Sequence, residues 1–289
     1  TALICGKSKV NGVLPSASEI SLLGGNGNVL FNKTFAFDTT VPFGMNQRQQ
    51  NAWMYWGGGL KLQREFLRDY NIISFPAGNT GTQMGGWFKK PVKTVADLKG
   101  LKMRIAGLGG EVMSRLGAIP QQIAGGDIYP ALEKGVIDAA EWVGPYDDEK
   151  LGFYKIAPNY YYPGWWEACS MYSMYVNIKE WEKLPKQYQE ALASACAECN
   201  IDMMAEYDYK NPIALQSLIK NGVKLHSYST EIMKAASNAA FEMYEEEASK
   251  NPSFKKIYEP WKKFRNDQML WNKVAEQTLM SFMLTNPVK

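Results

Sequence analysis

The stretch from residue 101 to residue 142 alternates short apolar segments with helical ones, and this alternation constrains the fold more than any other feature of the sequence. LKMRIAG (101–107) is predicted to be a strand and GGEVMSRLGA (109–118) a helix. IPQQIAGGDIYPALEKGVIDAAEW (119–142) is predicted to contain a strand, a helix and a last strand. Strands and helices that alternate in this way build a parallel or mixed sheet covered by helices. We therefore expect an α/β protein.

The flanking segments are expected to extend this architecture. FAFDTTVPFG (35–44) has the pattern of a strand, and residues 45–71 that of two helices broken at three consecutive glycines. IISFPAGNT (72–80) has the pattern of a buried strand. The chain becomes nearly all helical after residue 178, with helices expected at about 185–220, 230–250 and 259–283.

The size and charge of the chain exclude some classes of protein. Its 289 residues suit one large domain or two lobes. The net charge is only +3, and the Lys and Arg residues are scattered among acidic ones, so nothing indicates a nucleic-acid partner. The sequence has no apolar window of eighteen residues, so we expect no membrane span. Because it starts at Thr1 without a signal-peptide pattern, we expect either a processed protein or a fragment.

The cysteines and the histidine offer little chemistry. Cys196 and Cys199 form a CxxC pair, which suits either a redox or metal site or simple packing inside a helix. We favour packing, because the pair lies well inside a helical segment, no second CxxC exists, and His226 is the only histidine. A single histidine also counts against many hydrolases.

Five polar or aromatic residues are expected to meet at one edge of the sheet. Arg104 lies in one predicted strand, Glu141 and Trp142 end another, Gln83 follows a third, and Glu167 precedes a fourth. Open α/β sheets bind ligands outside the carboxyl ends of their strands. These residues are therefore the candidate binding site.

The chemistry of these residues alone leaves several alternatives open. Arg104 suits a ligand carboxylate or a structural ion pair with Asp127 or Asp138. Glu141 and Glu167 suit an acid–base pair for glycoside hydrolysis with neighbouring indoles stacking a sugar, oxygen ligands for a cation, or plain surface acids. An anion held beside two carboxylates would need a cation between them, which favours the second alternative.

Two other motifs have simpler explanations. Asp147 and Asp148 in PYDDEKLGFYK are expected to begin a helix, since acidic side chains interact favourably with a helix N-terminus. The glycine-rich segments GNTGTQMGG (78–86) and GLGGEVM (107–113) lack the spacing of phosphate-binding or dinucleotide-binding loops.

Long segments of the chain resemble the periplasmic solute-binding proteins of TRAP transporters, and most closely the branch that binds 2-oxo acids and related monocarboxylates. The resemblance is carried by GGWFKK, DLKGLKMRIAG, PQQIAGGDIYPALEKGVIDAAEWVGPYDDEKLGFYKIAPNYYYPGWWE, VNIKEWEKLP and FRNDQMLWNKVAEQTLMSFM. It covers roughly residues 35–283.

The resemblance implies a two-lobed α/β fold with mixed sheets, a helix-rich C-terminal part and a long C-terminal helix. Residues 1–100 would form part of lobe 1, and residues 101–178 mainly lobe 2 with crossing segments. Residues 179–289 would return across both lobes and end in the long helix. The front of the chain departs from the family, which has a longer N-terminal part.

The resemblance also assigns roles to the candidate residues. Arg104 would hold the substrate carboxylate, while Glu141 and Glu167 would coordinate Na⁺ or Ca²⁺. Gln83 would contact both the ion and the substrate. Trp142 would line the ligand and offer its backbone oxygen to the ion. No residue would be catalytic, because a receptor of this kind makes and breaks no bond.

The implied partners are a small carboxylate, the membrane subunits of a TRAP transporter in the periplasm, and a second copy of the chain bound through the C-terminal helix. Two alternatives remain: a glycoside hydrolase that uses the carboxylate pair, and a homologue that has lost binding because of its divergent front.

Overall fold

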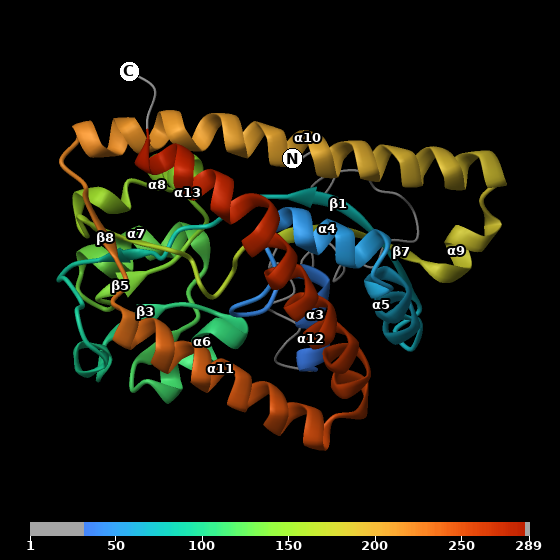
Figure 1. The fold of residues 1–289 in the computed structure, drawn as a ribbon, viewed down its shortest axis with the longest axis horizontal. Helices are drawn as coiled ribbons and strands as arrows, with labels where there is room; N and C mark the ends of the chain where they lie inside the picture. Colours follow the sequence, from blue (N-terminus) through green and yellow to red (C-terminus); the bar gives the residue numbers. More distant parts are fainter. Residues whose placement is uncertain (1–31, 287–289) are drawn as a thin grey trace.

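The computed structural model describes residues 32–286 (Figure 1). Its first half contains η2 (Lys33–Phe35), α3 (Ala36–Thr39), α4 (Gln47–Tyr55), α5 (Gly59–Arg68), β1 (Ile72–Asn79), β2 (Trp87–Phe88), η3 (Val95–Leu98), β3 (Lys102–Arg104), α6 (Gly107–Arg115), β4 (Ile119–Gln121), α7 (Gly125–Glu133) and β5 (Ala139–Ala140). Its second half contains α8 (Pro145–Leu151), η4 (Phe153–Lys155), β6 (Asn159–Tyr162), β7 (Met171–Asn177), α9 (Ile178–Lys183), α10 (Lys186–Lys220), β8 (Lys224–Ser227), α11 (Thr230–Lys250), α12 (Pro252–Asn272), the π-helical turn η5 (Lys273–Gln277) and α13 (Thr278–Thr285).

A six-stranded mixed sheet forms one end of the molecule, in the order β4-β3-β5-β2-β6-β8. The strands β4, β3 and β5 are parallel neighbours, and α6 and α7 connect them, so the predicted alternation of strands and helices is confirmed. The strand β2 runs antiparallel to both β5 and β6 and makes the sheet mixed.

A second sheet consists of the antiparallel pair β1 and β7, at the other end of the molecule (Figure 1). The long helix α10 packs against β1 and also against α8, which lies beside the large sheet. It therefore extends from one sheet to the other, along the upper edge of the view in Figure 1. The division of the chain at residues 100 and 178 stays a prediction.

Two hydrophobic clusters account for most of the core. The larger one joins β3 and α6 to α4, α11 and α12, with Trp53, Met103, Val112 and Tyr244 among its buried members. The smaller one lies around β2, β5 and β6, where the rings of Trp87 and Tyr160 stack with centroids 3.7 Å apart. Packing in the larger cluster thus holds α6 against the large sheet.

The expected strand at residues 35–44 is wrong, because this segment begins as the short helical elements η2 and α3. The Asn32 side chain accepts a hydrogen bond from the Thr34 amide at 3.0 Å and caps the first turn. Phe35 and Phe37 alternate with Ala36 in the manner of a strand, yet all three are buried. A segment buried on every side carries no periodicity that separates helix from strand. Residues 1–31, which contain most of the front expected to depart from the family, lie outside the described residues.

The C-terminal helix starts earlier than expected, at residue 252 and not at 259. Asn251 caps it by accepting from the Phe254 amide at 3.1 Å, and Pro252 occupies the first turn, where a missing N–H costs nothing. The helical path then continues through η5 and α13 to Thr285, so the predicted long C-terminal helix is confirmed (Figure 1).

The CxxC residues lie inside α10, as expected. Cys196 is buried, with its sulfur 3.9 Å from the Met174 sulfur, and Cys199 is partly exposed. Within the described part of the chain, no helix has both the length and the apolar character that crossing a membrane requires.

Asp38 of α3 is a carboxylate buried against β7, and it accepts hydrogen bonds from the side chains of Ser173 and Tyr175. Burial raises its pKa from 3.8 to about 6. The folded protein therefore binds this proton more tightly than the unfolded chain does, and stability falls as pH rises between about 4 and 6.

Asp38→Asn is expected to remove this dependence on pH. In urea denaturation at pH 3.5 to 7, the wild-type protein should lose about 3 kcal/mol relative to the variant, mostly between pH 4 and 6. Asp69→Asn, a change at an exposed aspartate, serves as the control and should follow the wild type. Parallel stability curves for wild type and Asp38→Asn would contradict the prediction.

Candidate functional site

The parallel pairing of β3 with β5 places Arg104 beside Glu141. Arg104 ends β3 opposite Ala140, the last residue of β5, and the Glu141 amide donates to the Arg104 carbonyl at 3.0 Å. Carboxyl ends of parallel neighbours meet at one sheet edge, so two residues far apart in the sequence become adjacent.

The Arg104 guanidinium is held by several groups at this edge. It forms an ion pair with the Glu141 carboxylate, and it donates to the backbone oxygens of Glu141 at 3.1 Å and Ile123 at 3.2 Å. Its central carbon lies 5.1 Å from the ring centroid of Trp142, within reach of a cation–π contact. The structural ion pair considered with Asp127 or Asp138 is wrong, since the partner of Arg104 is Glu141.

Glu141 and Glu167 share one small cavity. It has a volume of about 10 Å³ and is lined by Thr40, Pro42, Ile105, Ala106, Leu108, Gly109, Glu141, Trp166 and Glu167. That volume suits about one water, so a larger guest requires the lining groups to move. Two acids that are 26 positions apart in the chain are thus brought together.

The electrostatics of the cavity favour an added cation. Burial raises the pKa of the Glu141 carboxyl to about 7, while the Arg104 charge opposes the rise and the Glu167 charge adds to it. Two carboxylates in a poorly solvated space repel each other, and a cation between them would relieve the repulsion.

Gln83 is buried, and its side-chain oxygen accepts no hydrogen bond from the described residues. Its side-chain nitrogen contacts the Thr80 hydroxyl at 3.3 Å, whereas its Oε1 has no hydrogen-bond partner among the described residues. An unpaired buried oxygen is costly, and a hard cation accepts such a ligand. Gln83 does not line the cavity itself, but its backbone oxygen accepts from the Gly164 amide at 3.2 Å, three residues before Glu167.

Any cation held by these acids would also need neutral oxygen ligands. No cluster of three or more His, Cys, Asp or Glu side chains suited to a metal occurs in residues 32–286. The Gln83 amide oxygen and backbone oxygens can complete an all-oxygen site around two glutamates, which is the donor set that Ca²⁺ and Na⁺ accept.

Two glycines that sequence reasoning did not connect with the site make room for its indoles. A Cβ at Gly125 would lie 2.7 Å from the end of the Trp142 ring, and one at Gly109 would lie 2.8 Å from the Cβ of Trp166. The glycine pairs in GLGGEVM and IAGGD were the sequence feature from which this close packing could have been predicted. The first glycine of each pair packs closely against a tryptophan.

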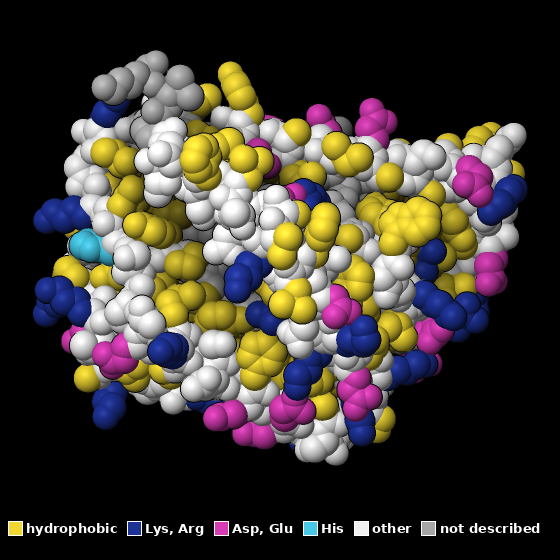
Figure 2. Space-filling view, viewed as in Figure 1, with side chains coloured by type: hydrophobic (Ala, Val, Ile, Leu, Met, Phe, Trp, Pro, Cys, Tyr) yellow, Lys and Arg dark blue, Asp and Glu magenta, His cyan; other side chains and the backbone are white. Residues whose placement is uncertain are grey.

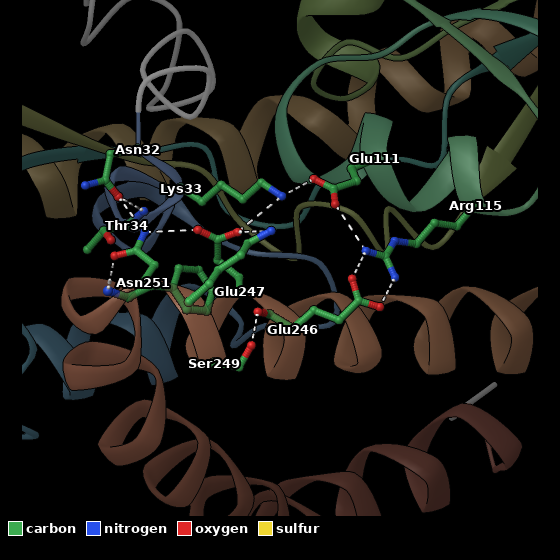
Figure 3. Close-up of polar contacts among 11 residues, drawn as sticks. Asn32, Lys33, Thr34, Glu111, Arg115, Glu246, Glu247, Ser249 and Asn251 are labelled. Atoms are coloured by element: carbon green, nitrogen blue, oxygen red, sulfur yellow. Dashed lines mark hydrogen bonds and ion pairs between the residues drawn. The ribbon is translucent and has the colours of Figure 1, made fainter.

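The helix α6, which supplies two cavity residues, Leu108 and Gly109, also forms ion pairs outside the cavity lining (Figure 3). Lys33 contacts Glu111 at 2.5 Å, and Arg115 contacts Glu246 of α11 at 2.6 Å. These pairs tie α6 to the beginning of the described chain and to α11. Each is partly exposed and therefore worth little alone, but together they fix the direction of the helix.

The matched family identifies the chain. Residues 6–251 match the model of the bacterial extracellular solute-binding proteins, family 7. The chain belongs to this family. It is a solute-binding receptor of the periplasmic TRAP type, and the resemblance read from the sequence is confirmed.

A curated relative and a solved structure support this assignment over most of the chain. A monocarboxylate 2-oxoacid-binding periplasmic protein of Nostoc sp. is 55% identical over 247 residues, which cover 86% of this chain and 68% of the relative. A TRAP solute-binding protein of Bordetella bronchiseptica RB50 superposes with a TM-score of 0.88 at 48% identity, covering 95% of this chain and 85% of that one. Its structure is a mixed-occupancy dimer with calcium and picolinate in one active site. The two-lobed fold is therefore confirmed.

Two further structures hold pyruvate. The TRAP protein of Colwellia psychrerythraea contains calcium and pyruvate, at 41% identity and a TM-score of 0.86. That of Pseudoalteromonas atlantica contains sodium and pyruvate, at 41% identity and a TM-score of 0.85. Each covers 89% of this chain and 79% of its own.

The close approach of Gly125 to Trp142 generates a prediction with a matched control. Gly125→Ala should lower the free energy of unfolding by about 1–3 kcal/mol, because the added methyl group displaces the indole from the Arg104 guanidinium. Gly126→Ala places its methyl group in open space and should change stability by no more than about 0.5 kcal/mol. Chemical denaturation of both variants measures the difference, and equal effects would refute this account of Gly125.

Proposed function

We propose that this chain binds a small monocarboxylate, either a 2-oxo acid such as pyruvate or the related hydroxy acid lactate, together with Ca²⁺ or Na⁺. The observation that carries the proposal is that two glutamates share one cavity while an arginine contacts one of them. Three similar receptors that hold a carboxylate together with calcium or sodium support it.

In this proposal each candidate residue has one role. Arg104 binds the carboxylate of the acid through its planar pair of N–H donors. The carboxylates of Glu141 and Glu167 bind the cation, with the free Oε1 of Gln83 and the backbone oxygen of Trp142 as further ligands. The acid's own oxygens complete the shell, so the ion bridges protein and ligand.

Binding requires a rearrangement of the ion pair. Glu141 is engaged by Arg104, so a cation that takes the Glu141 carboxylate frees the guanidinium for the incoming acid. Each ligand thereby prepares the site for the other, which is positive coupling. The lobes would close over both by hinge bending. The chain then delivers the acid to the membrane subunits of its transporter and catalyses no reaction.

Calorimetry tests the proposal. Pyruvate, lactate, 2-oxobutyrate and picolinate are titrated in calcium, in sodium, and after chelation in low-sodium buffer. Binding should require the cation. Arg104→Ala should reduce the binding free energy of the acid by about 2–5 kcal/mol, because the charge-assisted hydrogen bonds of the guanidinium are lost. Arg68→Ala, an exposed arginine, is the control and should bind like the wild type.

The glutamates give the second arm of this experiment. Glu141→Gln should lower the affinity for the cation and for the acid together. Glu182→Gln, at an exposed glutamate, should lower neither affinity. Unchanged affinities in Glu141→Gln would refute the bridging cation. No heat with any acid from folded wild-type protein would favour the non-binding homologue. Turnover of a glycoside would favour the hydrolase, for which a central Arg104 has no evident use.

We also propose that two copies of the chain associate through the C-terminal helix. Apolar side chains are exposed along η5 and α13, including Val274, Leu279, Phe282 and Leu284 at 60–74% exposure. Figure 2 shows hydrophobic side chains gathered at the surface where α13 lies. An exposed helix that is this apolar is typical of an interface. The dimer seen in the similar Bordetella structure supports a second copy as the occupant.

Sedimentation equilibrium of the full chain should show a dimer at micromolar concentration. Replacing both Leu279 and Phe282 with Glu should raise the dimer dissociation constant at least a hundredfold, since two charges would enter an apolar interface. Tyr209→Glu, at an exposed aromatic residue of α10, should leave it unchanged. A wild-type protein that stays monomeric at every concentration would contradict this proposal.

A further inference from the structure

Asp148, in the first turn of α8, is a buried carboxylate on which three donors converge. Its Oδ2 accepts from the Trp87 indole at 2.8 Å and from the Tyr160 hydroxyl at 2.7 Å. Its Oδ1 accepts from the Val143 amide at 3.1 Å. The donors come from β2, β6 and the segment after β5, so one side chain connects three parts of the smaller core.

The bond to Val143 reaches the candidate site directly. Val143 follows Trp142, and Glu141 precedes that tryptophan. The hydrogen bond from the Val143 amide to Asp148 therefore fixes the direction in which the chain leaves β5. With that direction it also fixes the positions of the Glu141 side chain and the Trp142 backbone oxygen.

Backbone hydrogen bonds continue from this point to the other proposed ligands. The Val143 carbonyl accepts from the Met84 amide at 2.9 Å, next to Gln83. The Gln83 carbonyl accepts from the Gly164 amide at 3.2 Å, and the Gly164 carbonyl accepts from the Glu167 amide at 3.3 Å. All the segments that carry proposed cation ligands are thus linked in one line of bonds that begins at Asp148.

We propose that Asp148 is a positioning residue of the cation site, which holds the segment of Glu141 and Trp142 in register with those of Gln83 and Glu167. This inference rests on the proposed function. It gives the second aspartate of PYDDEKL a role beyond starting a helix, since Asp147 remains at the surface side and binds the Tyr207 hydroxyl at 2.6 Å.

Only a carboxylate satisfies this arrangement. An asparagine at position 148 would present one oxygen and one NH₂ group. If the oxygen faced Trp87 and Tyr160, the NH₂ group would face the Val143 N–H. In the other orientation it would face the indole N–H. Either way, a donor meets a donor in a buried place, and a bond is lost.

The test compares Asp148→Asn with Tyr160→Phe by calcium titration, calorimetry with pyruvate, and thermal melting. Tyr160→Phe removes one hydrogen bond to Asp148 but leaves the Val143 bond and the ring that stacks on Trp87. We expect Asp148→Asn to weaken calcium binding at least tenfold and Tyr160→Phe less than threefold. Equal losses in the two variants would show a purely structural role and overturn the inference.

A measurement on the wild-type protein covers the case in which Asp148→Asn does not fold. If the Val143 bond supports the cation site, then calcium must in turn support that bond, because coupling is reciprocal. Calcium and pyruvate should slow hydrogen exchange of the Val143 amide at least tenfold. Unchanged exchange in a protein that binds calcium and pyruvate would overturn the inference alone. A wild-type protein that binds neither would overturn the proposed function as well.

Discussion

The closeness of the buried Glu141 carboxylate and the partly buried Glu167 carboxylate governs the candidate site. Glu141 and Glu167 line the same cavity, and water there is too scarce to screen their repulsion. Arg104 supplies one positive charge from the neighbouring strand. With both acids ionised, the three side chains keep one negative charge, and a bound monocarboxylate would add another. A divalent cation would balance both charges and a monovalent one only half, so the same site can take either ion with different residual charge.

The scaffold meets this constraint by placing charged side chains at strand ends and fixing the segments that follow. Parallel pairing of β3 and β5 sets Arg104 against Glu141. Glycines at positions 109 and 125 let the indoles approach closely. The helix α10 contacts both β1 of the small sheet and α8 beside the large sheet. One continuous helix therefore spans the two sheets.

Sequence patterns predicted several of the elements. The helices on either side of the glycine break, the buried strand β1, and the β3–β5 region were found as expected. Periodicity failed at residues 35–44, where burial on all sides removed the pattern. It also missed the first turns of α12, which begin at the Asn251 cap. Arg104 and Glu141 were predictable as neighbours, because the carboxyl ends of parallel strands meet. Gln83 and Glu167 flank strands of the other sheet, and the ion pair of Arg104 with Glu141 was not predicted.

The sequence by itself determined the family and the α/β class, since long motifs and the alternation of strands and helices are local properties of the chain. The five candidate residues stay a prediction from the sequence. Tertiary structure alone decided that Arg104 pairs with Glu141, that Gln83 keeps an unpaired oxygen, and that Asp148 collects three donors. Such partners are separated by up to 61 positions, as in Trp87 and Asp148, and no local pattern encodes them. A buried polar group must find whichever partner the packing brings within hydrogen-bond distance, and only the folded chain fixes that choice.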